Sequence, residues 1–214
     1  MSIEPERAET VVGFPPLANP DSVDPVVPGA LSDEATEVLI ALARPTGRIP
    51  RGQSAVASPD RWARNVDVDR RNGTVNASFW WRPADLAGEA LRVVRGEIRA
   101  LVERANQHLF RFALTEIDAA DPMVLLRFEA GDRRRPTMDL SGQHSRRKLT
   151  VLIPLSVPSV RVGGDLLFPG VPVQADQEPG HVTTMPAWVD WGLTPIESGS
   201  AVVAVCWAHG RPFR

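Results

Sequence analysis

One polar stretch of the chain carries residue types that can do chemistry. It runs from Gly131 to Ser156 and joins an arginine-rich loop, a candidate acid, Asp139, and a long apolar strand. Thr137 and Asp139 are two residues apart, so on a strand their side chains point the same way and can reach one ligand or metal ion. We take Asp139 as the candidate acid or base, with Thr137 and His144 as the other candidate catalytic residues.

Basic residues surround this candidate acid. The chain as a whole has 24 Lys and Arg against 26 Asp and Glu and a formal charge of -2, which makes a nucleic-acid partner the weaker interpretation. An anionic small molecule, such as a phosphate or a carboxylate, is a stronger one. For Arg133, Arg134 and Arg135 the favoured interpretation is a solvated run of charge. The six basic residues are Arg133, Arg134, Arg135, Arg146, Arg147 and Lys148.

Length and composition predict one domain with an appended arm. Residues 1–28 contain six prolines without a sustained period and are expected to form an extended N-terminal arm, and residues 29–214 to form the domain. The first residues are acidic and polar, unlike a secretory signal, and no run has the eighteen or so apolar residues of a membrane span. Cys206 is the one cysteine, which excludes an internal disulfide. We expect a cytoplasmic protein that does not bind a membrane.

The hydrophobic pattern predicts two helices followed by many short strands. Ser32 is a good N-cap for a helix to about Ala43, and an apolar stripe predicts a second helix from Pro83 to His108. Strand patterns follow at 109–114, 123–129, 148–155 and 201–207. This order favours a mainly β (α+β) fold, a sandwich or jelly roll with two helices packed on one sheet.

Several motifs occur in an order that is similar to a known family. The ordered set resembles the prolyl-4-hydroxylase-like branch of the iron(II)/2-oxoglutarate dioxygenases over roughly residues 26–214. The resemblance implies a double-stranded β-helix, which is a cupin-like jelly roll. The motifs are Leu126-Arg127-Phe128-x-x-Gly131-Asp132, Arg147-Lys148-Leu149-Thr150, Gly163-Gly164-Asp165-Leu166-Leu167-Phe168, Met185-Pro186-Ala187-Trp188, Leu193-Thr194-Pro195 and Trp207-x-x-Gly210-x-Pro212-Phe213-Arg214.

The chain departs from the family where the resemblance places the iron site. The family holds iron with a His-x-Asp motif and a distal His. Here Thr137, Asp139 and Trp191 stand at these positions, and an indole N–H has no lone pair to give to a metal. Ala201 stands where the family has the basic residue that pairs with 2-oxoglutarate. Asp139 is then expected to accept a hydrogen bond from the indole of Trp191.

These departures leave three functions open. The first is a degenerate dioxygenase-fold protein, a pseudoenzyme that binds a small molecule. The second is a metal-independent enzyme that uses the reshaped site for a cyclisation, elimination or rearrangement. The alternative is an active Fe(II)/2-oxoglutarate dioxygenase that hydroxylates a small molecule or a prolyl substrate with a non-standard metal site. A relocated site built from Asp139, His144 and His181 belongs to this alternative.

The candidate site residues follow from the first two functions. If the protein is an enzyme, metal-independent acid/base chemistry is favoured over oxygenation, and the sequence does not decide between an enzyme and a binding protein. No metal ligand is assigned and no cofactor is expected; Fe(II) and 2-oxoglutarate enter only with the alternative. The residues expected to bind a small-molecule ligand or substrate are Trp191, Arg147, Arg127, Trp207 and Ala201.

Overall fold

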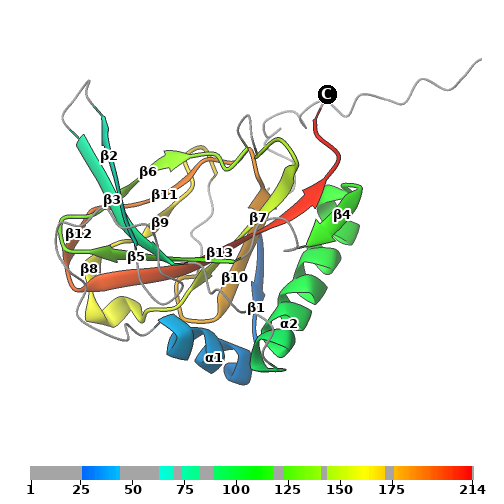
Figure 1. Ribbon diagram of the computed structural model, residues 1–214, viewed down its shortest axis with the longest axis horizontal. Coiled ribbons are helices and arrows are strands. Elements are labelled where there is room, and N and C mark those ends of the chain that lie inside the picture. Colours follow the sequence, from blue (N-terminus) through cyan, green and yellow to red (C-terminus); the bar gives the residue numbers. More distant parts are fainter. Residues whose placement is uncertain are drawn as a thin grey trace, which may run out of the picture.

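The structure is a computed structural model that describes residues 26–43, 63–69, 74–81, 89–117, 123–140, 144–171 and 176–213. Its described strands form one large sheet and two small ones, and two helices lie against the large sheet (Figure 1). Residues 1–25 of the predicted arm lie outside the described residues, and the arm's last residues, from Val27, belong to the first strand. The division into arm and domain stays a prediction.

All pairings in the large sheet are antiparallel. The short strand β4 (Leu114–Ile117) joins it by pairing with one end of its longest strand. The other strands follow one another across the sheet in the order β1 (Val27–Ala30), β10 (His181–Pro186), β7 (Arg147–Pro154), β13 (Ser200–Gly210), β5 (Val124–Glu129), β3 (Thr74–Trp81) and β2 (Ala63–Asp69).

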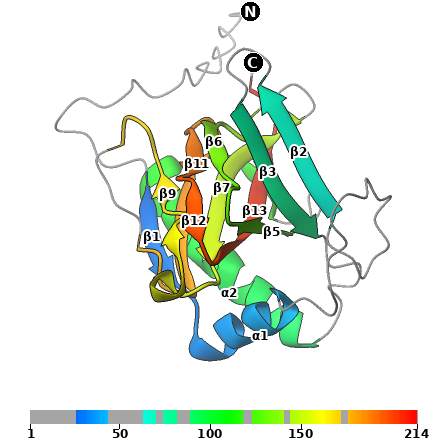
Figure 2. The same cartoon turned by 90° about the vertical axis from the view of Figure 1, so that its left-hand side faces the viewer.

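The two small sheets are made of very short strands. One has the order β6 (Arg134–Thr137), β11 (Trp191–Leu193) and β9 (Leu166–Leu167), and the other pairs β12 (Ile196–Ser198) with β8 (Val162–Gly163). A single 3-10 turn, η3 (Pro158–Val160), precedes β8. Figure 2 shows these strands beside β7 and β13 of the large sheet. Their side chains share one buried cluster with that sheet, so the two layers enclose a core.

Strands β7 and β13 are buried on both faces, which explains why they read as continuous apolar runs in the sequence. Alternate residues enter different cores because successive strand side chains point to opposite faces. Val151 and Cys206 belong to the core beneath the helices, whereas Leu152 and Val205 belong to the core between the sheets. The same alternation brings Thr150 and Trp207 to the face that carries the candidate site.

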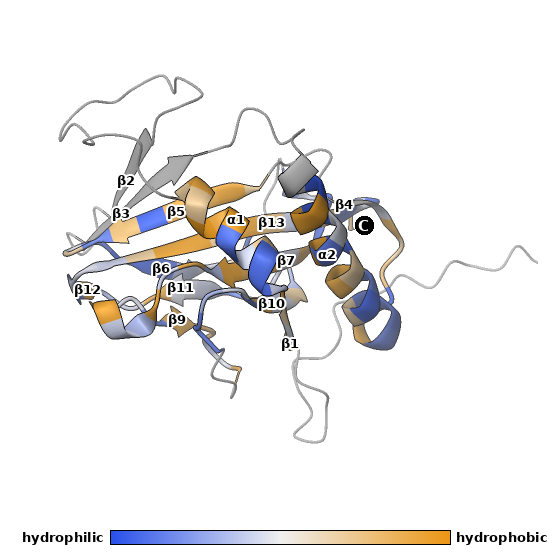
Figure 3. Ribbon diagram, turned by 90° about the horizontal axis from the view of Figure 1, so that it is seen from below, coloured by the Kyte–Doolittle hydropathy of each residue, from blue (hydrophilic) through white to orange (hydrophobic). Residues whose placement is uncertain are grey.

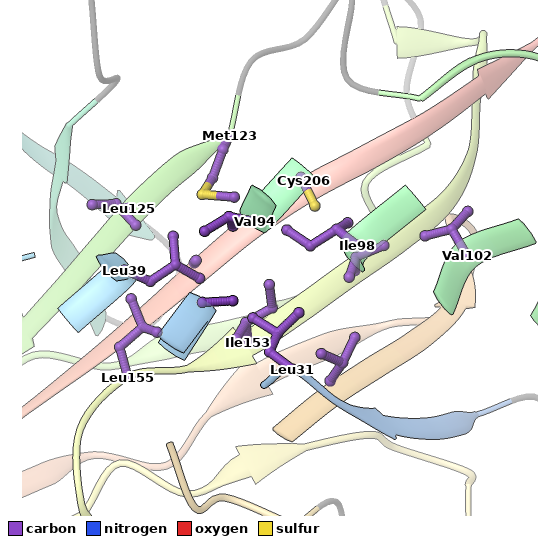
Figure 4. Close-up of a cluster of buried hydrophobic side chains, with 14 of the residues drawn as sticks. Leu31, Leu39, Val94, Ile98, Val102, Met123, Leu125, Ile153, Leu155 and Cys206 are labelled. Carbon is purple, nitrogen blue, oxygen red and sulfur yellow. The ribbon is translucent and has the colours of Figure 1, made fainter. Parts of the chain in front are cut away.

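The helices α1 (Asp33–Ala43) and α2 (Glu89–Ala105) cover one face of the large sheet (Figure 3). As predicted, Ser32 caps α1: its Oγ accepts a hydrogen bond from the Ala35 N–H at 3.2 Å. Leu39 of α1 and Val94, Ile98 and Val102 of α2 pack on strand residues such as Ile153 (Figure 4). The spacing of four residues between the three α2 side chains places them on one face of that helix.

The chain after α2 differs from the expectation. It continues as a π-helical turn, η1 (Asn106–Phe110), which ends at Arg111 with φ of 54°. The side chain of Asn106 both accepts from the Phe112 N–H at 2.8 Å and donates to the Phe112 carbonyl at 2.9 Å. These bonds replace strand pairing for Phe112, so the predicted strand at 109–114 is wrong and strand pairing begins at Leu114.

Within the described parts of the chain, no helix combines the length and the apolar character needed to cross a membrane. The cytoplasmic location remains a prediction.

Candidate functional site

Asp139 lies just after β6, and backbone hydrogen bonds fix its position. Its N–H and that of Leu140 both donate to the carbonyl of Ala187, at 3.0 and 2.9 Å. The residue is 8 % exposed, so its carboxylate is almost fully removed from water. A buried carboxylate needs hydrogen-bond donors to compensate for lost hydration.

Three donors from three different strands converge on one oxygen of this carboxylate. Oδ2 of Asp139 accepts from Thr150 Oγ1 at 2.9 Å, from Trp191 Nε1 at 3.0 Å and from Trp207 Nε1 at 3.0 Å. The hydrogen bond expected between Trp191 and Asp139 is therefore present. The sequence did not predict that the Trp207 indole and the Thr150 hydroxyl would donate to the same oxygen.

The guanidinium of Arg134 lies on the other side of the carboxylate. Its Nη2 is 3.4 Å from Asp139 Oδ1 and donates to Thr137 Oγ1 at 3.1 Å, and its Cζ lies 3.9 Å from the ring centroid of Trp191. Burial lowers the pKa of Arg134, and the charge of Asp139 opposes this shift by raising it. The sequence analysis included Arg134 only as one of six basic residues.

Arg147 makes a second cation–π contact in the same site. Its Cζ is 3.7 Å from the ring centroid of Trp207, and its Nη1 is 3.5 Å from the backbone carbonyl of Asp139. A register shift in the pairing of β7 with β13 allows this, because Ala208 pairs with Leu149 and His209 with Arg147. Arg147 therefore turns toward the site, while Lys148 turns to Phe213, with Nζ 3.1 Å from the ring centroid.

A second register shift brings Arg134 beside Thr137. On β6 and β11, Thr137 pairs with Trp191 and Arg134 pairs with Leu193, so three steps on β6 match two on β11. Simple alternation would have put Arg134 and Thr137 on opposite faces. The extra residue packs against Gly192, where a Cβ atom would lie 2.6 Å from the Arg134 carbonyl oxygen. Only glycine leaves room for this arrangement.

The other predicted site residues are Arg127, Ala201 and His144. Arg127 forms an ion pair with Glu129 at 3.3 Å on β5, on the strand face opposite to Phe128. Ala201 is 2 % exposed and pairs with Phe128 within the core between the sheets. His144 opens the segment before β7.

The relocated metal site is not assembled. His181 lies at the start of β10, with Nε2 at 3.3 Å from Asp176 Oδ2. Among the described residues, no three His, Cys, Asp or Glu side chains are grouped as metal ligands. Asp139, His144 and His181 are accordingly not brought together there.

Comparison with known proteins identifies the fold. No protein-family model and no curated protein matches the sequence. Three similar solved structures are a prolyl-4-hydroxylase from Pseudomonas putida, a prolyl hydroxylase from Trichoplax adhaerens in complex with a hypoxia inducible factor peptide fragment, and an oxidoreductase of the 2OG-Fe(II) oxygenase family from Burkholderia pseudomallei. Their TM-scores are 0.58, 0.60 and 0.50 at 17, 17 and 14 % identity.

These matches extend over most of each chain. In the same order they cover 88, 87 and 72 % of this protein and 94, 84 and 76 % of the other chain. The predicted jelly-roll fold with two helices, and the likeness to prolyl-4-hydroxylases, are therefore confirmed.

The same comparison contradicts the prediction that no cofactor is expected. The Burkholderia pseudomallei structure that shares this fold is a member of the 2OG-Fe(II) oxygenase family, so iron(II) and 2-oxoglutarate are the cofactors that this likeness of fold suggests. The prediction of no cofactor was wrong because it rested on the residue types at single positions, Thr137, Trp191 and Ala201, whereas the comparison rests on the whole fold.

The residues that the resemblance assigns to the iron position nevertheless do not fit iron(II). Thr137 offers a neutral hydroxyl, and it already accepts a hydrogen bond from Arg134. The nitrogen of Trp191 donates a proton to Asp139, and the oxygen that receives it also accepts two other hydrogen bonds. Iron(II) at a two-histidine, one-carboxylate site requires three free lone pairs on one face. We therefore derive no step through iron at these three residues.

Proposed function

We propose that this protein is a binding protein built on the prolyl-hydroxylase-like fold, in which the Asp139 site recognises a small molecule in place of coordinating iron. The observation that carries the proposal is the hydrogen bond from Trp191 Nε1 to Asp139 Oδ2 at 3.0 Å. This hydrogen bond reverses the role of the position at which the family has its distal histidine. The indole N–H of Trp191 donates a proton there, whereas a histidine nitrogen would donate a lone pair to the metal.

The buried position of Trp191 supports this proposal. The side chain is 1 % exposed and packs in the core between the sheets, so it cannot turn away to admit a metal without opening that core. Its ring also carries the guanidinium of Arg134 on one face. The tryptophan thus takes part in a polar cluster in which three donors, and no metal ion, occupy Oδ2 of Asp139.

Acid/base catalysis by Asp139 is less well supported than binding. A general base needs a carboxylate oxygen that can reach a substrate proton. Oδ2 of Asp139 already accepts three hydrogen bonds, and Oδ1 faces Arg134. The substrate would have to displace one of these donors before any proton transfer.

An active dioxygenase with a non-standard metal site is the second candidate. It is favoured by one observation, the likeness of the fold to 2OG-Fe(II) oxygenases. Metal binding separates the two candidates, because the binding protein should not take up iron(II) at the Asp139 site.

The test is a titration with iron(II) under anaerobic conditions, and with cobalt(II) as a spectroscopic substitute. We expect no binding by the wild-type protein below about 1 mM. The double variant Thr137→His with Trp191→His restores the two-histidine, one-carboxylate pattern and should gain micromolar binding and cobalt d–d absorption. The variant's fold is checked by circular dichroism, because replacing a buried tryptophan leaves a cavity.

The wild-type result decides the proposal even if the double variant does not fold. Stoichiometric, micromolar binding of iron(II) by the wild-type protein would support the dioxygenase. The Asp139→Asn variant, which keeps an oxygen acceptor for the three donors but loses the charge, then locates the ion: loss of binding in the folded variant would assign the ion to this site and contradict the proposal outright.

A further inference from the structure

The guanidinium of Arg134 contacts all three positions at which the fold family would hold its metal. It donates to Thr137 Oγ1 at 3.1 Å, lies 3.4 Å from Asp139 Oδ1 and stacks 3.9 Å from the ring centroid of Trp191. A positive charge from the chain itself therefore occupies the neighbourhood that a metal ion would otherwise occupy.

This guanidinium is not saturated by its described neighbours. The distance of 3.4 Å to Asp139 exceeds the 2.7–2.9 Å that is typical of a charge-assisted hydrogen bond. Its Nε is buried, and among the described residues no acceptor lies within bonding distance of it. A buried donor without an acceptor leaves the positive charge incompletely compensated, and an anion bound at the exposed part of the guanidinium would compensate it further.

The guanidinium is also accessible and held in one orientation. The Arg134 side chain is 26 % exposed, so a ligand can reach it from solvent. Stacking on Trp191 fixes the plane of the guanidinium on one side. A planar fork of N–H donors held in this way matches the geometry of a carboxylate.

We infer that Arg134 supplies the positive charge that a metal ion supplies in the fold family, and that it binds the carboxylate group of a small-molecule ligand. The inference rests on the proposed function, because it requires that no metal ion occupies the space between Thr137, Asp139 and Trp191. It adds the chemical class of the ligand and the residue that recognises it.

The test measures binding of 2-oxoglutarate and succinate to the whole protein in the presence of EDTA. Isothermal titration calorimetry gives the dissociation constant, and tryptophan fluorescence reports on the indole beneath Arg134. We expect Arg134→Met to weaken binding about ten- to hundredfold, the loss of one charged hydrogen-bonding group. Arg99→Met, on the exposed face of α2, removes the same charge elsewhere and should leave binding unchanged within about threefold.

Arg134→Lys keeps the charge and removes the planar fork, and it provides a result if the methionine variant does not fold. It should bind both dicarboxylates more weakly than the wild-type protein. The inference would be overturned if neither 2-oxoglutarate nor succinate bound the wild-type protein below about 10 mM in EDTA. It would also be overturned if the wild-type protein, Arg134→Met and Arg134→Lys bound these ligands equally well. Tighter binding of inorganic phosphate than of either dicarboxylate would also contradict it.

The metal titration keeps the two proposals distinguishable. Dicarboxylate binding that appears only after iron(II) is added would refute the proposed function together with the inference. Absence of both metal and dicarboxylate binding would refute the inference alone.

Discussion

The indole nitrogen of Trp207 lies 3.0 Å from Oδ2 of Asp139, although 68 residues separate them in the chain. The same oxygen accepts hydrogen bonds from Thr150 on β7 and Trp191 on β11. One carboxylate oxygen thus joins two strands of the large sheet to the small sheet that contains β11. Asp139 is consequently a structural centre as well as a candidate ligand-site residue.

Replacing Asp139 by alanine should destabilise the protein strongly. The change leaves two indole N–H groups and one hydroxyl in the core without their acceptor, and each lost acceptor costs about 1–3 kcal/mol. We expect a loss of about 3–5 kcal/mol in the free energy of unfolding, measured with urea. Asp139→Asn retains a carbonyl oxygen and should lose about 1–2 kcal/mol. Equal losses in the two variants would show that the oxygen acceptor is unimportant.

Thr150→Val should couple energetically to Asp139. Alone, the change removes one hydrogen bond from a buried threonine and should cost about 1 kcal/mol. In the Asp139→Ala background the same change should cost clearly less, since the acceptor is already gone. Thr194→Val is the control, because the Thr194 hydroxyl accepts from the Asp165 N–H and not from this cluster. If the losses in the free energy of unfolding of Asp139→Ala and Thr150→Val simply added in the double variant, the hydrogen bond between the two side chains would contribute nothing to stability.

Gly192→Ala should disturb the strand that carries Arg134. The new Cβ would lie 2.6 Å from the Arg134 carbonyl oxygen and 2.8 Å from the Pro136 nitrogen, and backbone atoms cannot rotate away. We expect a loss of about 1–3 kcal/mol in stability and a change in tryptophan fluorescence. Gly96→Ala on α2 meets no atom within 4 Å and should instead stabilise by about 0.5–1 kcal/mol. An unchanged free energy of unfolding in Gly192→Ala would contradict the close approach of the β6 backbone to Gly192.

Lys148 should make stability depend on pH in the alkaline range. It is the chain's single lysine, is 7 % exposed, and burial lowers its pKa below the ordinary value of 10.5. Between the folded and unfolded pKa values the unfolded chain binds more protons, so the free energy of unfolding rises as pH rises through this window. Below the folded pKa the cost of burying the charge is fully present.

Lys148→Met keeps the apolar stem and removes the charge, so it should abolish this rise in the free energy of unfolding as the pH approaches 10.5 from below. Urea unfolding across that range compares the two proteins. Tyrosine is absent from the chain, and the one cysteine, Cys206, is common to both proteins, so the difference isolates the lysine. A rise of equal size in both would assign the pH dependence to another group.

Sequence reasoning anticipated the features that depend on neighbouring residues. The cap at Ser32, the helix ending at Ala43 and the strand near 123–129 follow from local propensity and from the period of apolar residues. The expected contact between Trp191 and Asp139 came from the resemblance together with the need of a buried indole for an acceptor. The strand predicted at 109–114 was wrong, because there the side chain of Asn106 binds the backbone of Phe112 in place of a neighbouring strand.

By itself, then, the sequence determined most of the jelly-roll elements and the residue types at the positions that the resemblance assigns to iron, because both are set by local order along the chain. Only the tertiary structure decided what surrounds Asp139. Two register shifts turn Arg134 and Arg147 toward it, and the pairing of β7 with β13 brings Thr150 and Trp207 to the same face. Register between distant strands depends on packing of the whole sheet, and a shift of one residue reverses the face of every side chain that follows.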